Sequence, residues 1–228
     1  MILAVNTSTT QFSLALMREQ GDILAEYLVS PGEKNFKSFM PAVYSLFDAC
    51  GEDIKGLKAV VVARGPGSFT GLRVGLSMAK GVAQGLDIPI IGVSSLEAMA
   101  NQLPFLKQPL CTLLSSRKGE VIFALFNWDD EKGMTRITED QSLSFKDLAG
   151  FIKGPTYFIG NNFNAQHPMI KELIGADALT APPCLWTLRA SAVGALGLKR
   201  FANKDFDDII DLVPDYLRPP DIRPSPFV

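Results

Sequence analysis

The sequence predicts an α/β protein made of two similar half-domains, each a mixed sheet with flanking helices. Apolar runs rich in β-branched residues alternate with stretches of helical spacing. The order strand, strand, strand, helix, strand occurs twice at a separation of about 100 residues, which is typical of a duplicated unit. We therefore place the half-domains at residues 1–103 and 104–213, facing each other across a cleft. The proline-rich segment 214–228 is interpreted as a strap lying on the body of the protein.

The first half carries the clearer pattern. Residues 58–63 and 88–93 are apolar throughout, as expected for strands that are covered on both faces. Ser94 and Glu97 form a capping-box pattern, which predicts the start of a helix. The expected elements are strands at 1–6, 11–17, 23–29, 58–63 and 88–93, and helices at 38–50, 70–86 and from 94 onward.

The second half repeats this order less cleanly. Two prolines within residues 103–109 indicate the boundary, and Ser144 with Asp147 three positions later predicts a helix start. The expected elements are strands at 110–115, 121–127, 134–138 and 156–159, and helices at 144–152 and 187–201.

The composition of the 228-residue chain excludes several classes of protein. Hydrophobic residues make up 47% and charged residues 20%, which is typical of a globular protein rather than a disordered one. The net charge of −2 shows no basic excess, so nucleic acid is not expected to be a sole, direct partner.

The same reasoning predicts where the protein resides. Its apolar runs are far shorter than the roughly 20 residues that span a bilayer, and its N-terminus lacks the features of a signal peptide. Cys50, Cys111 and Cys184 show no CxxC spacing, which argues against a disulfide framework or a zinc ribbon. We therefore expect a soluble, cytoplasmic protein with reduced thiols and no contact with membranes.

A single histidine, His167, limits the chemistry open to this chain. A two-histidine metal helix needs a second histidine, and no GxSxG nucleophile motif occurs. His167 stands beside Pro168 in no known motif, so a surface or helix-start position is the favoured interpretation. We predict no metal site and no catalytic residue, and therefore a protein that is not itself an enzyme.

Residues 64–73 link an expected strand to an expected helix and are rich in glycine. Backbone N–H groups around Gly67, together with Ser68 and Thr70 at the helix start, would favour an anion there. The pattern matches neither a Walker A loop nor GxGxxG. A tight turn closed by a helix cap explains the same residues equally well.

The helix expected at 70–86 has an unusual face. Glycine costs about 1 kcal/mol relative to alanine inside a helix, so four glycines in this helix need a reason, and close approach of another helix is one. The helix at 38–50 carries small residues at matching spacing, beginning at Ser38. The two helices either pack on each other within the subunit or jointly present a partner surface with Met78 and Val82 as anchors. The predicted interface residues are Ala42, Ser45, Ala49, Gly71, Val74, Gly75, Met78 and Val82.

Several segments spread over essentially the whole chain resemble the TsaB family, also called YeaZ. The segment GPGSFTGLR is specific to that family, whereas the opening strand is shared with the wider actin/Hsp70/sugar-kinase fold. The segments that carry the resemblance are 2–9 (ILAVNTST), 64–73 (RGPGSFTGLR), 88–96 (IPIIGVSSL), 116–121 (SRKGEV) and 214–218 (PDYLR).

The resemblance implies two ribonuclease-H-like half-domains of the actin/Hsp70/sugar-kinase type and a role in modifying tRNA. TsaB-like proteins are needed for threonylcarbamoylation of the adenosine next to the anticodon, but they do not perform the transfer. A paralogue, TsaD, carries the metal-holding HxxxH motif and acts on the tRNA, and the ATPase TsaE joins the pair. TsaB-like proteins pair with TsaD through their first two helices and form homodimers through the same helices when alone. This implies no cofactor for this chain, with ATP and Mg²⁺ at the partner subunits and tRNA met only within the complex.

Two departures bear on nucleotide binding. ATP-binding relatives of this fold place an acidic residue at the end of the first strand, where this chain has Asn6, and TsaB-like chains usually read Asp-Ala-Arg where this chain reads Ser115-Ser116-Arg117. Amides and hydroxyls are poor Mg²⁺ ligands beside carboxylates. The residues expected near an anion or nucleotide are Thr7, Ser8, Gly67, Ser68, Thr70 and Arg117.

Two other functions compete with the scaffold. The duplicated order also suits an ATP-dependent sugar or acetate kinase of the same fold, although Asn6 and the missing aspartate at 115–117 count against it. A peptidase, a label sometimes given to the wider family, is disfavoured because the chain has neither a two-histidine metal site nor GxSxG.

Overall fold

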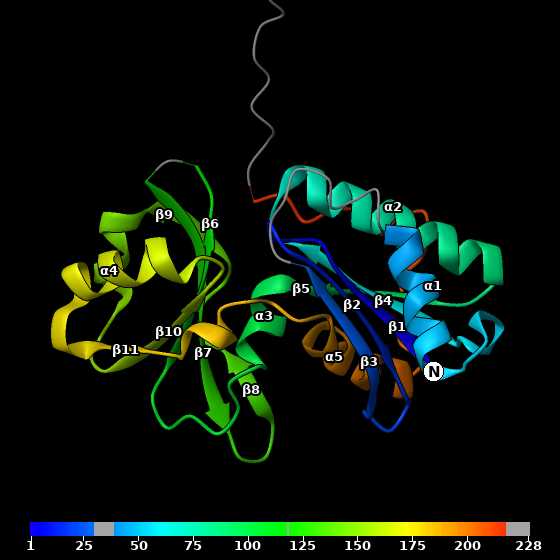
Figure 1. Cartoon of the computed structure of the whole chain (residues 1–228). Helices are drawn as coiled ribbons and strands as arrows, with labels where there is room; N and C mark the ends of the chain where they lie inside the picture. Colours follow the sequence, from blue (N-terminus) through cyan, green and yellow to red (C-terminus); the bar gives the residue numbers. More distant parts are fainter. Residues whose placement is uncertain (30–38, 118, 218–228) are drawn as a thin grey trace, which may run out of the picture.

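Two mixed β-sheets, each flanked by helices, make up the protein (Figure 1). The computed structural model describes residues 1–29, 39–117 and 119–217. The two sheets have the order β3-β2-β1-β4-β5 and β11-β10-β6-β7-β8, with β9 paired to β7. The predicted α/β architecture of two sheet-based halves is confirmed.

The first sheet follows the predicted strand pattern closely. Antiparallel pairing joins β1 to β2 and β2 to β3, whereas β1 pairs with β4 and β4 with β5 in parallel. Val5 of β1 lies opposite Val62 of β4. Because parallel strands end at the same edge, this register sets the loop after β1 beside the loop after β4. The five strands are β1 (Ile2–Asn6), β2 (Phe12–Met17), β3 (Ile23–Val29), β4 (Ala59–Gly65) and β5 (Ile90–Ser94).

Helices cover both faces of this sheet. α1 (Phe39–Cys50) and α2 (Phe69–Leu86) share one face (Figure 1) and join one apolar cluster with side chains such as Leu3 and Val60. The opposite face packs against α5 (Ala190–Ala202). Burial on both faces explains why β1 and most of β4 are apolar.

The second sheet confirms four predicted strands and adds two short ones. The region predicted to be a helix at 144–152 is a 3-10 helix, η3 (Phe145–Phe151), capped by Ser144. A further helix, α4 (Phe163–Ile174), was not predicted; it contains His167 and Pro168. The strands are β6 (Leu110–Ser115), β7 (Glu120–Asp129), β8 (Gly133–Arg136), β9 (Gln141–Ser144), β10 (Thr156–Gly160) and β11 (Ala178–Thr180).

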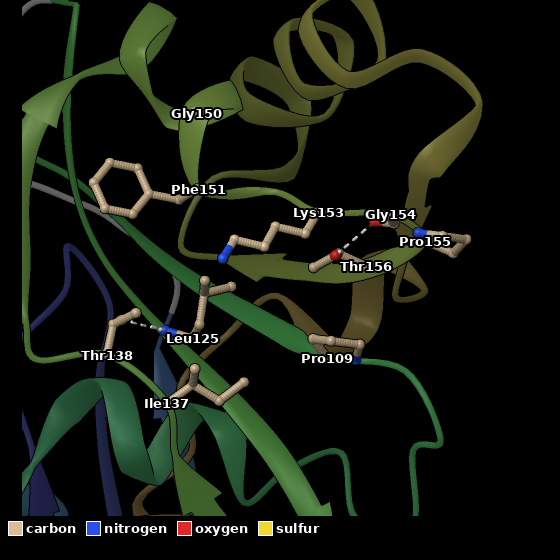
Figure 2. Close-up of a pocket in the computed structure, with 10 residues that line it drawn as sticks. All are labelled: Pro109, Leu125, Ile137, Thr138, Gly150, Phe151, Lys153, Gly154, Pro155 and Thr156. Carbon is tan, nitrogen blue, oxygen red and sulfur yellow. Dashed lines mark hydrogen bonds between the residues drawn. The ribbon is translucent and has the colours of Figure 1, made fainter.

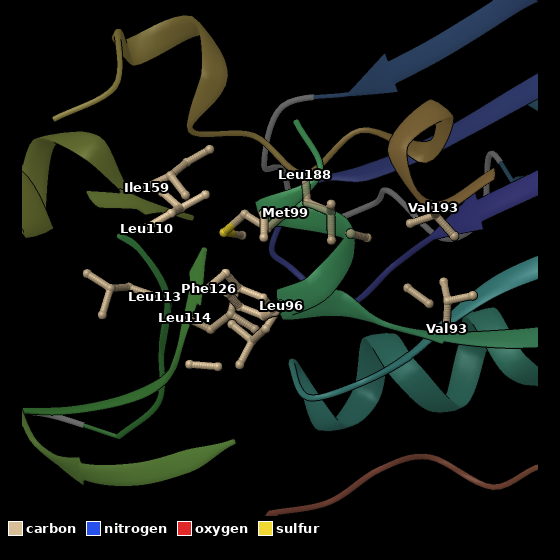
Figure 3. Packing of buried hydrophobic residues seen from close by; sticks show 14 of the residues in the cluster. Val93, Leu96, Met99, Leu110, Leu113, Leu114, Phe126, Ile159, Leu188 and Val193 are labelled. Carbon is tan, nitrogen blue, oxygen red and sulfur yellow. The ribbon is translucent and has the colours of Figure 1, made fainter. Parts of the chain in front are cut away.

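Helices of each half contact the other half. α3 (Ser95–Ala100) follows the first sheet in sequence yet contacts β6 of the second, while α5 returns from the second half to cover the first sheet. Met99 of α3 lies beside Leu110 and Ile159 of the second sheet in one continuous core (Figure 3). A cut of the chain at 103/104 would therefore divide a shared core.

The start of the predicted strap lies on the first half. The backbone N–H of Asp215 donates to the carbonyl of Arg64 over 2.8 Å, and the ring of Tyr216 packs 4.9 Å from that of Phe69 between centroids. Residues 218–228 of the strap, Ser38 and Lys118 lie outside the described residues. In the part of the chain that the structure describes, no helix is long and apolar enough to cross a membrane.

Candidate functional site

The loop after β1 lies directly against the start of α2. A Cβ atom added at Gly71 would come within 2.0 Å of the carbonyl oxygen of Thr7, and one at Gly75 within 2.0 Å of the Thr7 hydroxyl oxygen. At Gly67 the same construction meets the carbonyl oxygen of Ser8 at 2.2 Å. Contacts shorter than about 3 Å leave no room for a side chain. These three glycines therefore let the chain's own loop approach the helix.

The same contacts use groups that were predicted to face an anion. The backbone N–H of Ser68 donates to the carbonyl of Ser8 over 2.7 Å. The hydroxyl of Ser68 accepts the N–H of Gly71 over 3.2 Å and caps α2. Thr70 is exposed, whereas Thr7 and Ser8 are buried. The contacts support the turn with its cap, and anion binding at this loop stays a prediction.

Asn6, the residue at the end of β1 that the resemblance singled out, is held by three neighbours, Leu188, Ser8 and Ser13. Its amide nitrogen donates to the carbonyl of Leu188 over 2.8 Å, and its amide oxygen accepts the N–H of Ser8 over 3.0 Å and the Ser8 hydroxyl over 2.7 Å. Asn6 has no exposed surface. An amide with both ends engaged offers neither the charge nor the free oxygen that Mg²⁺ prefers, so these residues do not fit a Mg²⁺–phosphate site.

At the end of β6 in the second half, side-chain amides form a second hydrogen-bond network. Ser115 ends β6, and its backbone N–H donates to the side-chain oxygen of Asn161 over 2.9 Å. Gln166 of α4 is buried and donates to Ser115 Oγ and Asn161 Oδ1, each over 3.3 Å. Arg117 lies exposed on the turn that follows. This end of the sheet thus also presents neutral side chains that bond one another.

Two side chains of the types that often serve as nucleophile or base, Cys111 and His167, are engaged within the fold. Burial raises the pKa of the Cys111 thiol far above its ordinary value, so the sulfur stays protonated and weakly nucleophilic. His167 stacks on Phe163 within α4, with 4.6 Å between ring centroids. Among the described ranges, no three His, Cys, Asp or Glu side chains gather as a metal site would require.

The predicted partner surface on α1 and α2 contains both exposed and buried residues. Ser45 and Ala49 are exposed as expected, but Ala42 is buried in the chain's own core. Three more of the predicted residues, Val74, Met78 and Val82, are half-buried along α2.

Two of the predicted interface residues, Gly71 and Gly75, are not exposed to a partner. Both are buried against Thr7, so their small size serves a contact within the chain rather than a second helix. The two glycines farther along α2, Gly81 and Gly85, are exposed, and a Cβ at either meets nothing within 4 Å. We call the exposed or half-buried set the α1–α2 outer face. Its residues are Tyr44, Ser45, Ala49, Val74, Met78, Gly81, Val82 and Gly85.

Residues 210–216, which lead into the strap and form its start, run along one side of α2. Arg73 donates to the Tyr216 hydroxyl over 2.9 Å and lies over the Phe69 ring, with 3.8 Å to its centroid. Lys80 donates to the carbonyl of Ile210 over 3.3 Å. The polar stripe of α2 therefore meets the chain's own C-terminal segment, which the helical pattern alone did not reveal.

The partners that hold the strand ends were not predicted. Leu188, Asn161 and Gln166 lie far along the chain from the residues they bond, at separations of 182 for Asn6–Leu188 and 46 for Ser115–Asn161. Asn161 lies two residues after the strand predicted at 156–159, and this position was the one available signal.

Comparisons with known proteins agree with this architecture. The family model described as TsaD, tRNA N6-adenosine threonylcarbamoyltransferase, matches residues 33–206. The chain is 33% identical over 220 residues to the tRNA threonylcarbamoyladenosine biosynthesis protein TsaB of Bacillus subtilis, covering 95% of this chain and 93% of that protein. It is 27% identical over 234 residues to the Haemophilus influenzae protein of the same name, again covering 95% and 93%.

Solved structures show the same fold. An uncharacterized Pseudomonas aeruginosa protein, described as similar to peptidase YEAZ, superposes with a TM-score of 0.79 at 21% identity, covering 95% of this chain and 99% of that one. The Clostridium difficile activator of 2-hydroxyisocaproyl-CoA dehydratase, described with bound ADPNP, superposes with a TM-score of 0.51 at 11% identity, covering 91% and 98%. The fold is that of YeaZ and of the actin-like ATPases, and the full-length identity to the Bacillus subtilis protein shows that this chain belongs to the TsaB (YeaZ) family.

Proposed function

We propose that this chain is a non-catalytic subunit required for threonylcarbamoylation of the adenosine next to the anticodon in tRNA. It acts as the dimerisation scaffold for a TsaD-like transferase and, with it, a TsaE-like ATPase. The observation that carries the proposal is the similarity over 95% of the chain to a relative named for tRNA threonylcarbamoyladenosine biosynthesis. ATP and Mg²⁺ are expected at the partner subunits, and tRNA is reached through the complex.

The α1–α2 outer face is the proposed docking surface. Ser45, Ala49, Gly81 and Gly85 have little or no side chain, so a partner helix can approach the backbone closely. Tyr44 is 60% exposed on the same face and supplies the aromatic area that is enriched at interfaces. When the chain is alone, a second copy is expected to cover this face.

The neutral strand ends support a non-catalytic role. Asn6 and Ser115 occupy the positions around which nucleotide chemistry is organised in ATP-binding relatives, and both are bonded to amides and carbonyls of this chain. The kinase alternative therefore has no specific observation in its favour. Tight binding of Mg-ATP to the isolated chain, measured by calorimetry, would restore it.

Charge placed on the outer face tests the docking surface. Gly81→Arg and Gly85→Arg add a bulky cation where a Cβ meets nothing within 4 Å, so the fold is retained. Burying that cation against a partner should weaken co-purification with the TsaD-like transferase about 100-fold. Ala195→Arg is the control, because Ala195 is a small, exposed residue of α5, which covers the opposite face of the first sheet.

Two readouts decide the outcome. The Gly81 and Gly85 variants should lose both partner binding and the modified nucleoside in cells depleted of the native chain, whereas Ala195→Arg should retain both. Equal partner binding by all three variants would contradict the docking surface. Normal tRNA modification in cells lacking the chain would contradict the function itself.

A further inference from the structure

A cavity of about 600 Å³ opens in the second half of the molecule and has no role in the function proposed above. Figure 2 shows its lining, which includes Leu125, Ile137, Phe151, Lys153 and Thr156. We call it the Lys153 pocket. Small-molecule sites usually have volumes of about 300–1,000 Å³, mostly apolar walls and a few polar groups. The pocket fits that description.

An interruption in the sheet creates the pocket. β7 pairs with β9 as far as Phe123 and with β8 from Phe126 onward, which leaves Ala124 and Leu125 between the two ladders. The N–H of Leu125 donates to the Thr138 hydroxyl over 3.0 Å, and its carbonyl accepts the N–H of Ile137 over 2.7 Å. The backbone is thus satisfied without a strand above it, and the space beside Leu125 stays open.

An apolar side chain remains exposed at the rim. Ile137 is 48% exposed, although it borders a wall formed by Leu125, Phe151 and Pro109. A large aliphatic side chain at the mouth of an apolar cavity gains free energy when a ligand covers it, at about 25 cal/mol for each Å² removed from water. The walls therefore favour a ligand with an apolar body.

Only one charged side chain, Lys153, stands in the described lining, and of the two hydroxyls there only that of Thr138 keeps its proton for a ligand. The Thr138 hydroxyl already accepts from Leu125, and the Thr156 hydroxyl donates to the Gly154 carbonyl over 2.9 Å. Lys153 has no hydrogen-bond or ion-pair partner within residues 1–29, 39–117 and 119–217. Figure 2 shows its ammonium group reaching across the pocket toward Leu125. A single unpaired cation over apolar walls matches a ligand with one negative charge.

We propose that the Lys153 pocket binds a small amphiphilic monoanion, a carboxylate with an aliphatic or aromatic body. Lys153 holds the carboxylate, while Leu125, Ile137 and Phe151 contact the apolar body. A dianion such as a phosphate monoester would call for a second cation, and Lys153 is the one charged residue among the described residues that line the pocket. The site shares no residue with the α1–α2 outer face, so the two proposals stand or fall separately.

Octanoate and 1-octanol test the pocket as a matched pair, because they differ in the charged group. In a titration of the ¹⁵N-labelled full chain to about 10 mM ligand, octanoate should shift the amides of Leu125, Ile137 and Thr138, with a dissociation constant of roughly 1 mM. Octanol, titrated only up to its lower solubility limit in water and compared with octanoate at equal concentrations, should shift the same amides more weakly. The proposal would be overturned if the pocket amides do not shift when octanoate is added. It would also be overturned if they shift only when a protein partner is added.

Two variants separate the charge from the apolar wall. Lys153→Met keeps the aliphatic stem and should weaken octanoate about fivefold without changing octanol, while Lys107→Met, at another exposed lysine, should change neither. Ile137→Thr should weaken both ligands about threefold, with Ile210→Thr as its exposed control. If Lys153→Met leaves the affinity for octanoate unchanged, Lys153 does not hold the carboxylate. If the variants and their controls lose affinity equally, the ligand does not bind in the Lys153 pocket.

Discussion

The two ends of α2 use glycine for different reasons. Near its start, Gly71 and Gly75 are pressed against Thr7 of the loop after β1, where no side chain fits. Near its end, Gly81 and Gly85 face open space. The first pair is explained by packing within the chain, whereas the second pair costs helix stability without an internal reason. Glycines that form one face in the sequence thus divide into a structural pair and a pair available to a partner.

The largest expected effect is at Gly71. Gly71→Ala sets a methyl group 2.0 Å from a backbone carbonyl oxygen that cannot move without displacing β1. We expect the free energy of unfolding to fall by about 3 kcal/mol, at the upper end of overpacking costs. Urea unfolding followed by circular dichroism measures this loss. A change below about 0.5 kcal/mol, the level usual for surface substitutions, would show that the contact with Thr7 is not tight.

A double-mutant cycle at Gly75 tests which atom is in the way. Gly75→Ala should cost about 2 kcal/mol, because its methyl group overlaps the Thr7 hydroxyl. Thr7→Ala removes that hydroxyl, which has no hydrogen-bond partner within the described residues, and should recover about 1 kcal/mol or more of the Gly75→Ala loss. The same Thr7 change should not rescue Gly71→Ala, because the obstacle there is backbone. If the losses of stability from Gly75→Ala and Thr7→Ala simply add in the double variant, the Thr7 hydroxyl is not the obstacle at Gly75.

The smallest expected effect has the opposite sign. Gly81→Ala and Gly85→Ala should each raise the free energy of unfolding of the isolated chain by about 0.5–1 kcal/mol, since alanine is the better helix former and nothing stands near either Cβ. Thermal unfolding at a low protein concentration, at which self-association is weak, provides the measurement. A loss of stability at either position would mean that these glycines also serve the chain's own fold.

Most of the secondary structure could be predicted because it depends on local patterns. The apolar runs at β4 and β5 and the Ser94 cap of α3 were all recognised in the sequence. α4 was missed because Pro168 interrupts its second turn, where proline removes a backbone hydrogen bond. The placement of α5 on the first sheet was missed because sequence periodicity shows that a helix has an apolar face but not which sheet that face covers.

The candidate site was predictable only in part, for the same reason. A cap at the start of α2 was one of two interpretations that the sequence left open, because the bond from Gly71 to Ser68 spans only three residues. The contact of Thr7 with Gly71 and Gly75, and the bond of Asn6 to Leu188, join residues that are distant in sequence. A helical wheel also cannot distinguish a glycine that faces its own loop from one that faces solvent, so Gly71 and Gly75 were assigned to the wrong contact.

Hydroxyl-radical footprinting of the chain with and without a TsaD-like transferase tests the docking surface most directly. Tyr44 of α1 is 60% exposed and Met78 of α2 is half-buried, and both side chains react readily with the radical. The account predicts that oxidation of both falls when the partner binds, while Phe105, which is 74% exposed on the second half, reacts as before. Protection of Phe105 with unchanged Tyr44 and Met78 would contradict it.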